Sequence, residues 1–233
     1  MHKEEFIKAL EDLGISINEV QLNQLKEYYN LLIEYNTHTN LTRITEEKDV
    51  YLKHFYDSLT ICKVINLNNQ ELLDIGTGAG FPGLVLKIVF PHLKVTLVDS
   101  LNKRIIFLNS VIKKLGLTDI KAIHERAETY IKDNREKYDI VTSRAVANLN
   151  LLSELCLPYV KIGGYFISMK ADIKDEIASS LNAIKTLGGV IKEIKEFKLP
   201  KENSLRTLVK IEKTVKTSVK YPRKFNEIKK KPL

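Results

Sequence analysis

A glycine-rich loop is the feature of this sequence that most constrains its fold. Residues 72–83 read LLDIGTGAGFPG, so four glycines fall within eight positions directly after a short apolar run. Glycine adopts positive φ at no steric cost and lets the backbone approach a ligand closely. The segment therefore predicts a strand, a turn and a helix in succession, with a ligand held against bare backbone.

The second half of this loop, from Gly78 to Gly83, matches the pattern G-x-G-x-x-G of nucleotide-binding turns. A tight turn that binds nothing can have the same letters, so the context matters. A second predicted strand ends at Asp99, 21 residues after Gly78, where an acid can accept hydrogen bonds from a ribose. The context favours a nucleoside-containing ligand at the carboxyl edge of a sheet.

Asp74 bears on which nucleoside compound is bound. It ends the apolar run two residues before Gly76. Where water is scarce, a carboxylate at this place repels the pyrophosphate of a dinucleotide, whereas S-adenosylmethionine has no phosphate and carries an ammonium and a sulfonium. We therefore expect S-adenosylmethionine as the cofactor, and a methyltransferase rather than an oxidoreductase.

Apolar patterns after residue 70 alternate between short strands and longer helices. Strands are predicted at 71–75, 94–98, 119–123, 138–142, 163–168, 189–197 and 204–211, and helices at 82–90, 101–115, 128–134, 149–160 and 171–187. Such alternation predicts an α/β fold whose mostly parallel sheet is covered on both faces. The last two strands have no helix between them, which predicts a terminal hairpin and one antiparallel strand inserted beside its neighbour.

The segments on either side of this region differ from it. Residues 1–65 show apolar residues at helical spacing, which predicts a helical extension packed on the methyltransferase domain at 66–212. Its second helix is expected to turn inward Leu22, Leu25, Tyr29, Leu32 and Ile33. Residues 213–233 hold eight Lys or Arg against one acid, which is +7 of the net +8 of the chain. This basic tail predicts a polyanionic partner, RNA or DNA ahead of a membrane, although a tail that only aids solubility is the alternative.

Composition excludes several classes of protein. The only cysteines are Cys62 and Cys156, without the spacing of a disulfide framework or a zinc site, so neither a disulfide nor a bound metal is expected. No signal peptide or membrane span is predicted. These features predict a cytoplasmic protein with reduced thiols.

The acceptor of the methyl group is expected to lie after the fourth strand, at Ser143-Arg144-Ala145-Val146. Enzymes that methylate exocyclic amines often have Asn/Asp-Pro-Pro-aromatic here, and pyrimidine C5 enzymes need a nucleophilic cysteine, whereas Cys156 falls in an apolar helix. Guanine N7 offers a free lone pair and needs neither a general base nor a covalent intermediate. No catalytic side chain is therefore expected, and alignment of the reactants suffices. The missing motifs alone do not establish N7.

Seven stretches then occur in a specific order: NLT (40–42), HFYDSL (54–59), LLDIGTGAGFPGL, VTLVDSLNKRIIFL (95–108), RAE (126–128), SRAVANL (143–149) and YPRKFNEIKKKPL (221–233). Together they resemble the RsmG family, or glucose-inhibited division protein B, the bacterial 16S ribosomal RNA guanine-N7 methyltransferases. The resemblance covers about residue 20 to the end of the sequence. It implies a class I, Rossmann-like S-adenosylmethionine-dependent methyltransferase fold with a seven-stranded, mostly parallel sheet.

The resemblance also implies roles for individual residues. The cofactor-binding positions are Gly76, Gly78, Gly80, Phe81, Asp99, Ala127, Glu128 and Arg144. The substrate side is expected to include His54, Asp57, Ser58 and Lys170, although Ala171 stands where the family has a glycine. The tail residues expected to contact RNA are Lys220, Arg223, Lys224, Lys229, Lys230 and Lys231. The implied partner is 16S rRNA, either free or within an assembling small ribosomal subunit.

Two other functions are compatible with the residues alone. An enzyme of the same fold can methylate a small molecule or a protein. A non-catalytic RNA-binding protein can retain the cofactor loop.

Overall fold

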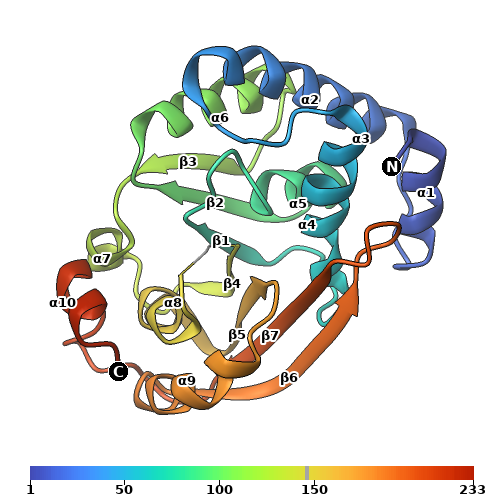
Figure 1. The fold of residues 1–233 in the computed structure, drawn as a ribbon. Coiled ribbons are helices and arrows are strands. Elements are labelled where there is room, and N and C mark those ends of the chain that lie inside the picture. Colours follow the sequence, from blue (N-terminus) through green and yellow to red (C-terminus); the bar gives the residue numbers. More distant parts are fainter. Residues whose placement is uncertain (145–146) are drawn as a thin grey trace.

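One twisted sheet organises the molecule. The computed structural model describes residues 1–144 and 147–233. Within them lie seven strands: β1 (Glu71–Ile75), β2 (Lys94–Asp99), β3 (Ile120–His124), β4 (Tyr138–Ser143), β5 (Val160–Lys170), β6 (Gly189–Lys198) and β7 (Leu205–Lys213). Their order is β3-β2-β1-β4-β5-β7-β6, and β7 is antiparallel to both neighbours (Figure 1). The other pairs are parallel, so the predicted sheet and its terminal hairpin are confirmed.

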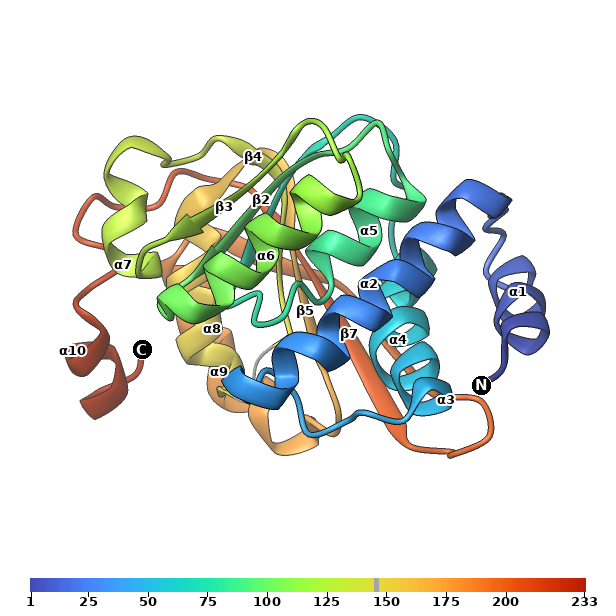
Figure 2. The same ribbon diagram turned by 90° about the horizontal axis from the view of Figure 1, so that it is seen from above.

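Helices cover both faces of this sheet (Figure 2). The α-helices are α1 (Lys3–Glu11), α2 (Glu19–Thr39), α3 (Glu47–Val50), α4 (Asp57–Leu59), α5 (Gly83–Val89), α6 (Asn102–Lys114), α7 (Ala127–Tyr130), α8 (Leu149–Cys156), α9 (Lys174–Thr186) and α10 (Phe225–Lys230). Short turns of other helix types are η1 (Tyr51–Tyr56), η2 (Thr60–Lys63), η3 (Ile131–Asp133) and η4 (Leu157–Tyr159). In the described part of the chain, no helix is both long and apolar enough to span a bilayer.

Side chains that alternate along the strands divide the interior into two cores. On β1, Leu72 belongs to the core that contains the N-terminal helices, α5 and α6, whereas Leu73 belongs to the core beneath α7, α8, α9 and α10. Residues 1–65 thus share a core with the sheet.

Helix α2 starts at a reciprocal cap, in which Asn18 and Gln21 bond each other's backbone N–H groups. Its buried residues are Leu22, Leu25, Tyr28 and Leu32. Tyr29 and Ile33, expected on the inner face, are only half-buried. The helix is rotated so that Tyr28 faces inward, where its hydroxyl group finds a partner in the glycine loop.

The basic segment 213–233 packs against the body of the molecule instead of extending from it. Lys213 ends β7 and is buried, as are Tyr221 and Ile228. Arg223 forms an ion pair with Glu154 on α8, with Nη2 and Oε2 2.6 Å apart. The segment is therefore an integral part of the fold.

Candidate functional site

Three adjoining cavities lie over the carboxyl ends of the parallel strands. The first has a volume of about 400 Å³ and is lined by Asp99. The second, of about 310 Å³, lies over the glycine loop. The third, of about 470 Å³, is lined by residues of η1, β5 and β7. Gly76 and Arg104 line both the first and the second cavity, and His54 and Arg144 line both the second and the third. The three spaces thus form one continuous row.

The glycine loop has the backbone that its sequence predicts. Gly76, Gly78 and Gly80 have φ values of +69°, +62° and +102°, a region that side chains with a Cβ rarely adopt. A Cβ on Gly80 would also lie 2.7 Å from the Tyr28 hydroxyl and 2.9 Å from Leu84 Cβ. Glycine is required at this position for both reasons.

Tyr28, which is not among the residues expected on the inner face of α2, holds this loop. Its hydroxyl group donates a hydrogen bond to the carbonyl of Ala79, and its ring stacks against Phe81 with the centroids 5.6 Å apart. Tyr28 has no exposed surface. No sequence motif marks this contact, because it joins two segments that are 51 residues apart.

Asp74 acts inside the loop and not on a ligand. Its Oδ2 accepts hydrogen bonds from Thr77 Oγ1 at 2.6 Å and from Gly83 N at 2.9 Å. The side chain is fully buried and is absent from the walls of all three cavities. Burial raises the pKa of Asp74 to about 6. The expectation that this carboxylate faces the cofactor is wrong, because its hydrogen bonds stabilise the turn and the side chain reaches none of the cavities.

Asp99 lies at the edge of the first cavity. Its Oδ2 accepts hydrogen bonds from Gly78 N at 2.9 Å and Arg104 Nη1 at 3.0 Å, and its Oδ1 accepts one from Leu101 N at 2.9 Å. A carboxylate has about four acceptor sites, so one site on Oδ1 is left for a ribose hydroxyl group.

The rest of the first cavity suits an adenine ring. Ala127 and Glu128 line it together with Asp99, as the sequence analysis grouped them. Leu151 and Leu155 of α8 add apolar surface, against which a flat aromatic base can pack. The free acceptor site of Asp99 and the apolar lining of this cavity therefore fit the ribose and the adenine of S-adenosylmethionine.

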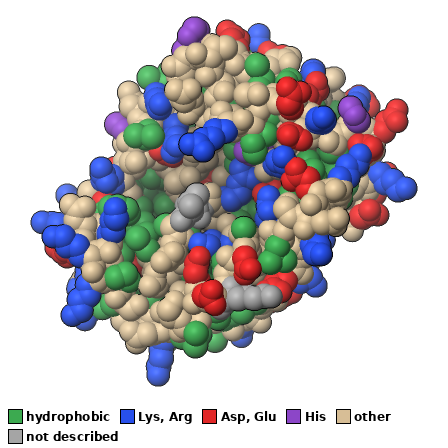
Figure 3. Space-filling view, viewed as in Figure 1, with side chains coloured by type: hydrophobic (Ala, Val, Ile, Leu, Met, Phe, Trp, Pro, Cys, Tyr) green, Lys and Arg blue, Asp and Glu red, His purple; other side chains and the backbone are tan. Residues whose placement is uncertain are grey.

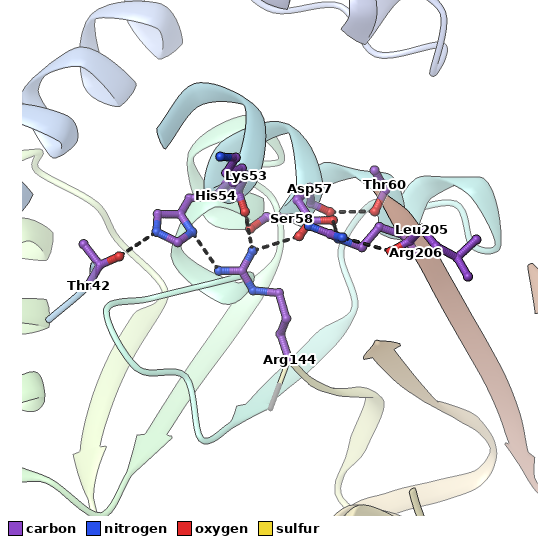
Figure 4. Close-up of polar contacts among 9 residues, drawn as sticks. All are labelled: Thr42, Lys53, His54, Asp57, Ser58, Thr60, Arg144, Leu205 and Arg206. Atoms are coloured by element: carbon purple, nitrogen blue, oxygen red, sulfur yellow. Dashed lines mark hydrogen bonds and ion pairs between the residues drawn. The ribbon is translucent and has the colours of Figure 1, made fainter. Parts of the chain in front are cut away.

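Arg144 connects the second cavity to the third (Figure 4). Its Nη1 donates to the Lys53 carbonyl at 3.0 Å and to Asp57 Oδ2 at 3.2 Å, and its Nη2 lies 3.2 Å from His54 Nδ1. On the other side, Arg206 Nε donates to Asp57 Oδ1 at 3.0 Å. Asp57 therefore bridges two arginines, which neutralises part of the positive charge in the wall.

The protonation state of His54 follows from these contacts. A guanidinium group can only donate, so Nδ1 of His54 accepts from Arg144, and Nε2 carries the proton toward Thr42 Oγ1, 2.9 Å away. Burial and the nearby Arg144 charge lower the pKa of His54 to about 3. The neutral ring stacks on Phe81, with centroids 4.3 Å apart and planes at 16°.

The two remaining residues expected on the substrate side, Lys170 and Ser58, differ in their position relative to the third cavity. Lys170 lines the third cavity, where its Nζ donates to the Ala147 carbonyl at 2.6 Å and pairs with Glu176 at 2.9 Å. Ser58 is fully buried and donates to the His54 carbonyl at 2.6 Å. Ser58 lines none of the three cavities, and its expected place on the substrate side stays a prediction.

Arg206 is a site residue that the sequence analysis missed. It lies at the start of β7 and lines the third cavity beside Lys53. The only sequence signal for this role was an arginine near the start of the predicted strand at 204–211.

The tail residues also fall into two groups. Arg223 directs its guanidinium at Glu154, so it is not a free phosphate-binding cation as expected. The other five are exposed: Lys220, Lys224, Lys229, Lys230 and Lys231. Basic side chains gather on the left of the face shown in Figure 3, where α10 lies. Ala145 and Val146, part of the acceptor stretch in the sequence analysis, lie outside the described residues.

Comparison with known proteins points to one family. The GidB family model, described as rRNA small subunit methyltransferase G, matches residues 21–205. The ribosomal RNA small subunit methyltransferase G of Bacillus cereus (strain B4264) is 51% identical over 237 residues, covering 100% of this chain and 99% of that protein. The protein of that name from Limosilactobacillus reuteri (strain DSM 20016) is 50% identical over 240 residues, with 100% of both chains covered.

Solved structures agree on the architecture. A SAM-dependent methyltransferase from Aquifex aeolicus superposes with a TM-score of 0.57 at 16% identity, over 75% of this chain and 97% of that one. The expected Rossmann-like, class I methyltransferase fold is confirmed.

Proposed function

The chain belongs to the family of rRNA small subunit methyltransferase G, and from this premise we propose that it methylates N7 of one guanine in 16S ribosomal RNA. The observation that carries the proposal is the continuous row of cavities. A nucleoside-sized space beside Asp99 leads past the glycine loop to a space lined by cations, and Arg144 and His54 stand at the boundary.

When bound, S-adenosylmethionine supplies an electrophilic methyl group. We propose that Asp99 accepts a hydrogen bond from its ribose and that Ala127 and Glu128 border its adenine. The open backbone of Gly76 and Gly78 leaves room for its methionine part at the second cavity.

The third cavity suits a nucleotide of RNA. Lys53, Lys170 and Arg206 line it, and each is paired with a carboxylate. Phosphate oxygens would replace these carboxylates as partners of the three cations. Apolar side chains of Ile44 and Phe197 line the same space, and an aromatic ring there can stack on a base. A guanine that reaches this cavity must be unpaired or turned out of its helix.

The boundary residues are suited to align reactants and not to move protons. His54 Nδ1 already accepts from Arg144, so it is not free to act as a general base. N7 of guanine has no proton to remove. Holding the acceptor nitrogen in line with the methyl group can lower the activation free energy by roughly 7–11 kcal/mol.

We further propose that the enzyme works in the cytoplasm and meets 16S rRNA in an assembling small ribosomal subunit. The exposed lysines around α10 support contact with a folded, phosphate-rich surface.

The direct test is transfer of radiolabelled methyl groups to 16S rRNA from a strain in which the family's gene is deleted. Naked rRNA and isolated small subunits serve as parallel substrates, and the modified base is mapped by chain cleavage at N7-methylguanine. We expect label in one guanine. Label that appears only in an RNA-free lysate would assign the enzyme another acceptor, and cofactor binding without any transfer would make it a binding protein.

A further inference from the structure

The basic C-terminal segment reaches the first cavity. Phe225, the first residue of α10, lines this cavity together with Asp99, Ala127 and Glu128. It is half-buried and packs against the core beneath α8, so part of the side chain is covered and part is open. Figures 1 and 2 show α10 beside α7 and α8, the two helices that border the same space.

We propose that Phe225 completes the adenine-binding wall of the cofactor pocket, so that the segment assigned to RNA also holds the methyl donor. The proposal deepens the proposed function and rests on it. Leu151, Leu152 and Leu155 line the cavity from α8. Phe225 adds the only aromatic ring among the residues that line this cavity in the described chain. An aromatic ring offers a flat apolar surface on which a base stacks well.

A buried ion pair fixes Phe225 in place. Arg223, two residues earlier, donates to Glu154 Oε1 from its backbone N and from Nε, each at 2.9 Å, and to Oε2 from Nη2 at 2.6 Å. The Glu154 side chain has no exposed surface. A carboxylate in such a place is retained only with a well-matched partner, and the bidentate geometry defines the path of the chain.

Contacts on both sides reinforce this anchor. Upstream, the carbonyl of Tyr221 accepts a hydrogen bond from Arg135 Nη2, and the Tyr221 ring is buried. Downstream, Ile228 is fully buried in the core beneath α8. The segment 221–228 is thus held at three points, and the ring of Phe225 is positioned between them.

Exposed lysines next to Phe225 place the proposed adenine wall beside the proposed RNA-binding surface. Lys224 precedes Phe225 directly, and Lys229 and Lys230 lie on the same helix, all exposed. Phosphate contacts by these lysines would act on the element that carries the adenine wall.

The test is calorimetric titration of purified protein with S-adenosylmethionine and S-adenosylhomocysteine in the absence of RNA. Phe225→Ala is expected to raise both dissociation constants about tenfold and by the same factor, since the two ligands share the adenine. Asn226→Ala, at the exposed neighbouring position, is the matched control and should bind both ligands as the wild type does.

A second variant reports the contact itself. The chain contains no tryptophan, so Phe225→Trp introduces a single tryptophan at the proposed wall, which can be excited selectively over the ten tyrosines. Its emission should change on titration with S-adenosylhomocysteine and follow the calorimetric curve of the same variant.

Unchanged affinity in Phe225→Ala, or constant emission while calorimetry records binding to Phe225→Trp, overturns the proposal. In either case a wild-type protein that binds the cofactor leaves the proposed function intact. A wild type that binds neither ligand would instead contradict the proposed function.

Discussion

At the scale of single residues, one hydroxyl group joins the N-terminal extension to the glycine loop. Tyr28→Phe removes the hydrogen bond to the Ala79 carbonyl and leaves that buried acceptor unpaired. We expect a loss of about 1–3 kcal/mol in the free energy of unfolding, together with weaker cofactor binding, because the loop is less well ordered. Urea unfolding and calorimetry measure the two effects.

Tyr29→Phe is the control for this prediction, since the Tyr29 hydroxyl group donates to the Thr45 carbonyl at an exposed site. It should change neither quantity appreciably. Equal stability of the Tyr28 variant and the wild type would show that the loop keeps its shape without this bond.

His54 makes stability depend on pH. Its pKa is about 3 in the folded protein and about 6.5 in the unfolded chain, so between these values only the unfolded state binds the proton. Stability therefore falls as the pH drops below about 6.5, by about 2 kcal/mol at pH 5. Asp74 acts with opposite sign, because its pKa of about 6 lies above the unfolded value and acidification favours the folded state.

His54→Asn isolates the histidine contribution, because its amide oxygen still accepts from Arg144. When the pH is lowered from 7 to 5, the free energy of unfolding of the variant should fall by about 2 kcal/mol less than that of the wild type. The measurement is urea unfolding of both proteins at the two pH values. Parallel pH profiles would refute the assignment of the low pKa.

Residues in local motifs were predictable, and residues that meet through the fold were not. The glycines and Asp99 are close in sequence to the strands that place them, so spacing was enough. Tyr28 and Arg206 reach the site from distant segments, and no spacing rule links them to it. Asp74 was placed at the right end of the right strand, but only the structure reveals that its Oδ2 accepts hydrogen bonds from Thr77 and Gly83.

At the scale of elements, the glycine loop supplies a graded test. Gly80→Ala combines a φ of +102° with a Cβ that would lie 2.7 Å from the Tyr28 hydroxyl, 2.9 Å from Leu84 and 2.9 Å from Leu108. Gly78→Ala has a φ of +62° and no atom within 4 Å of its Cβ. We expect the Gly78 variant to lose about 1 kcal/mol and the Gly80 variant at least about 3 kcal/mol, as measured by urea unfolding. Equal losses would contradict the role of the close contact.

Strands and helices between residues 71 and 213 were predictable to within a few residues because their apolar periodicity is strong, whereas α10 in the basic segment was not predicted. All seven strands occur where the pattern placed them. The π-helical turn η1 was not predictable, since periodicity does not distinguish it from an α-helix over six residues. It nevertheless matters, because it directs His54 toward Arg144.

At the scale of the whole molecule, charge and packing of the basic segment can be separated. Deletion of 213–233 would remove the partner of buried Glu154, so point variants are the sharper tool. Replacing Lys229, Lys230 and Lys231 by Ala should weaken RNA binding and lower the salt slope of log K by up to about 0.7 for each lost phosphate contact. The measurement is filter binding at salt concentrations from about 50 to about 200 mM. An unchanged slope would remove these lysines from the RNA interface.

The boundary formed by Arg144 and His54 has a kinetic consequence. Exposed Arg126 lines the first cavity and exposed Ala171 lines the third, and these two cavities share no lining residue in the described chain. Spent cofactor and methylated RNA can therefore leave from opposite ends of the row, and neither has to wait for the other. Steady-state turnover should follow a random order of product release, with S-adenosylhomocysteine competing only against the methyl donor and methylated RNA competing only against unmodified RNA.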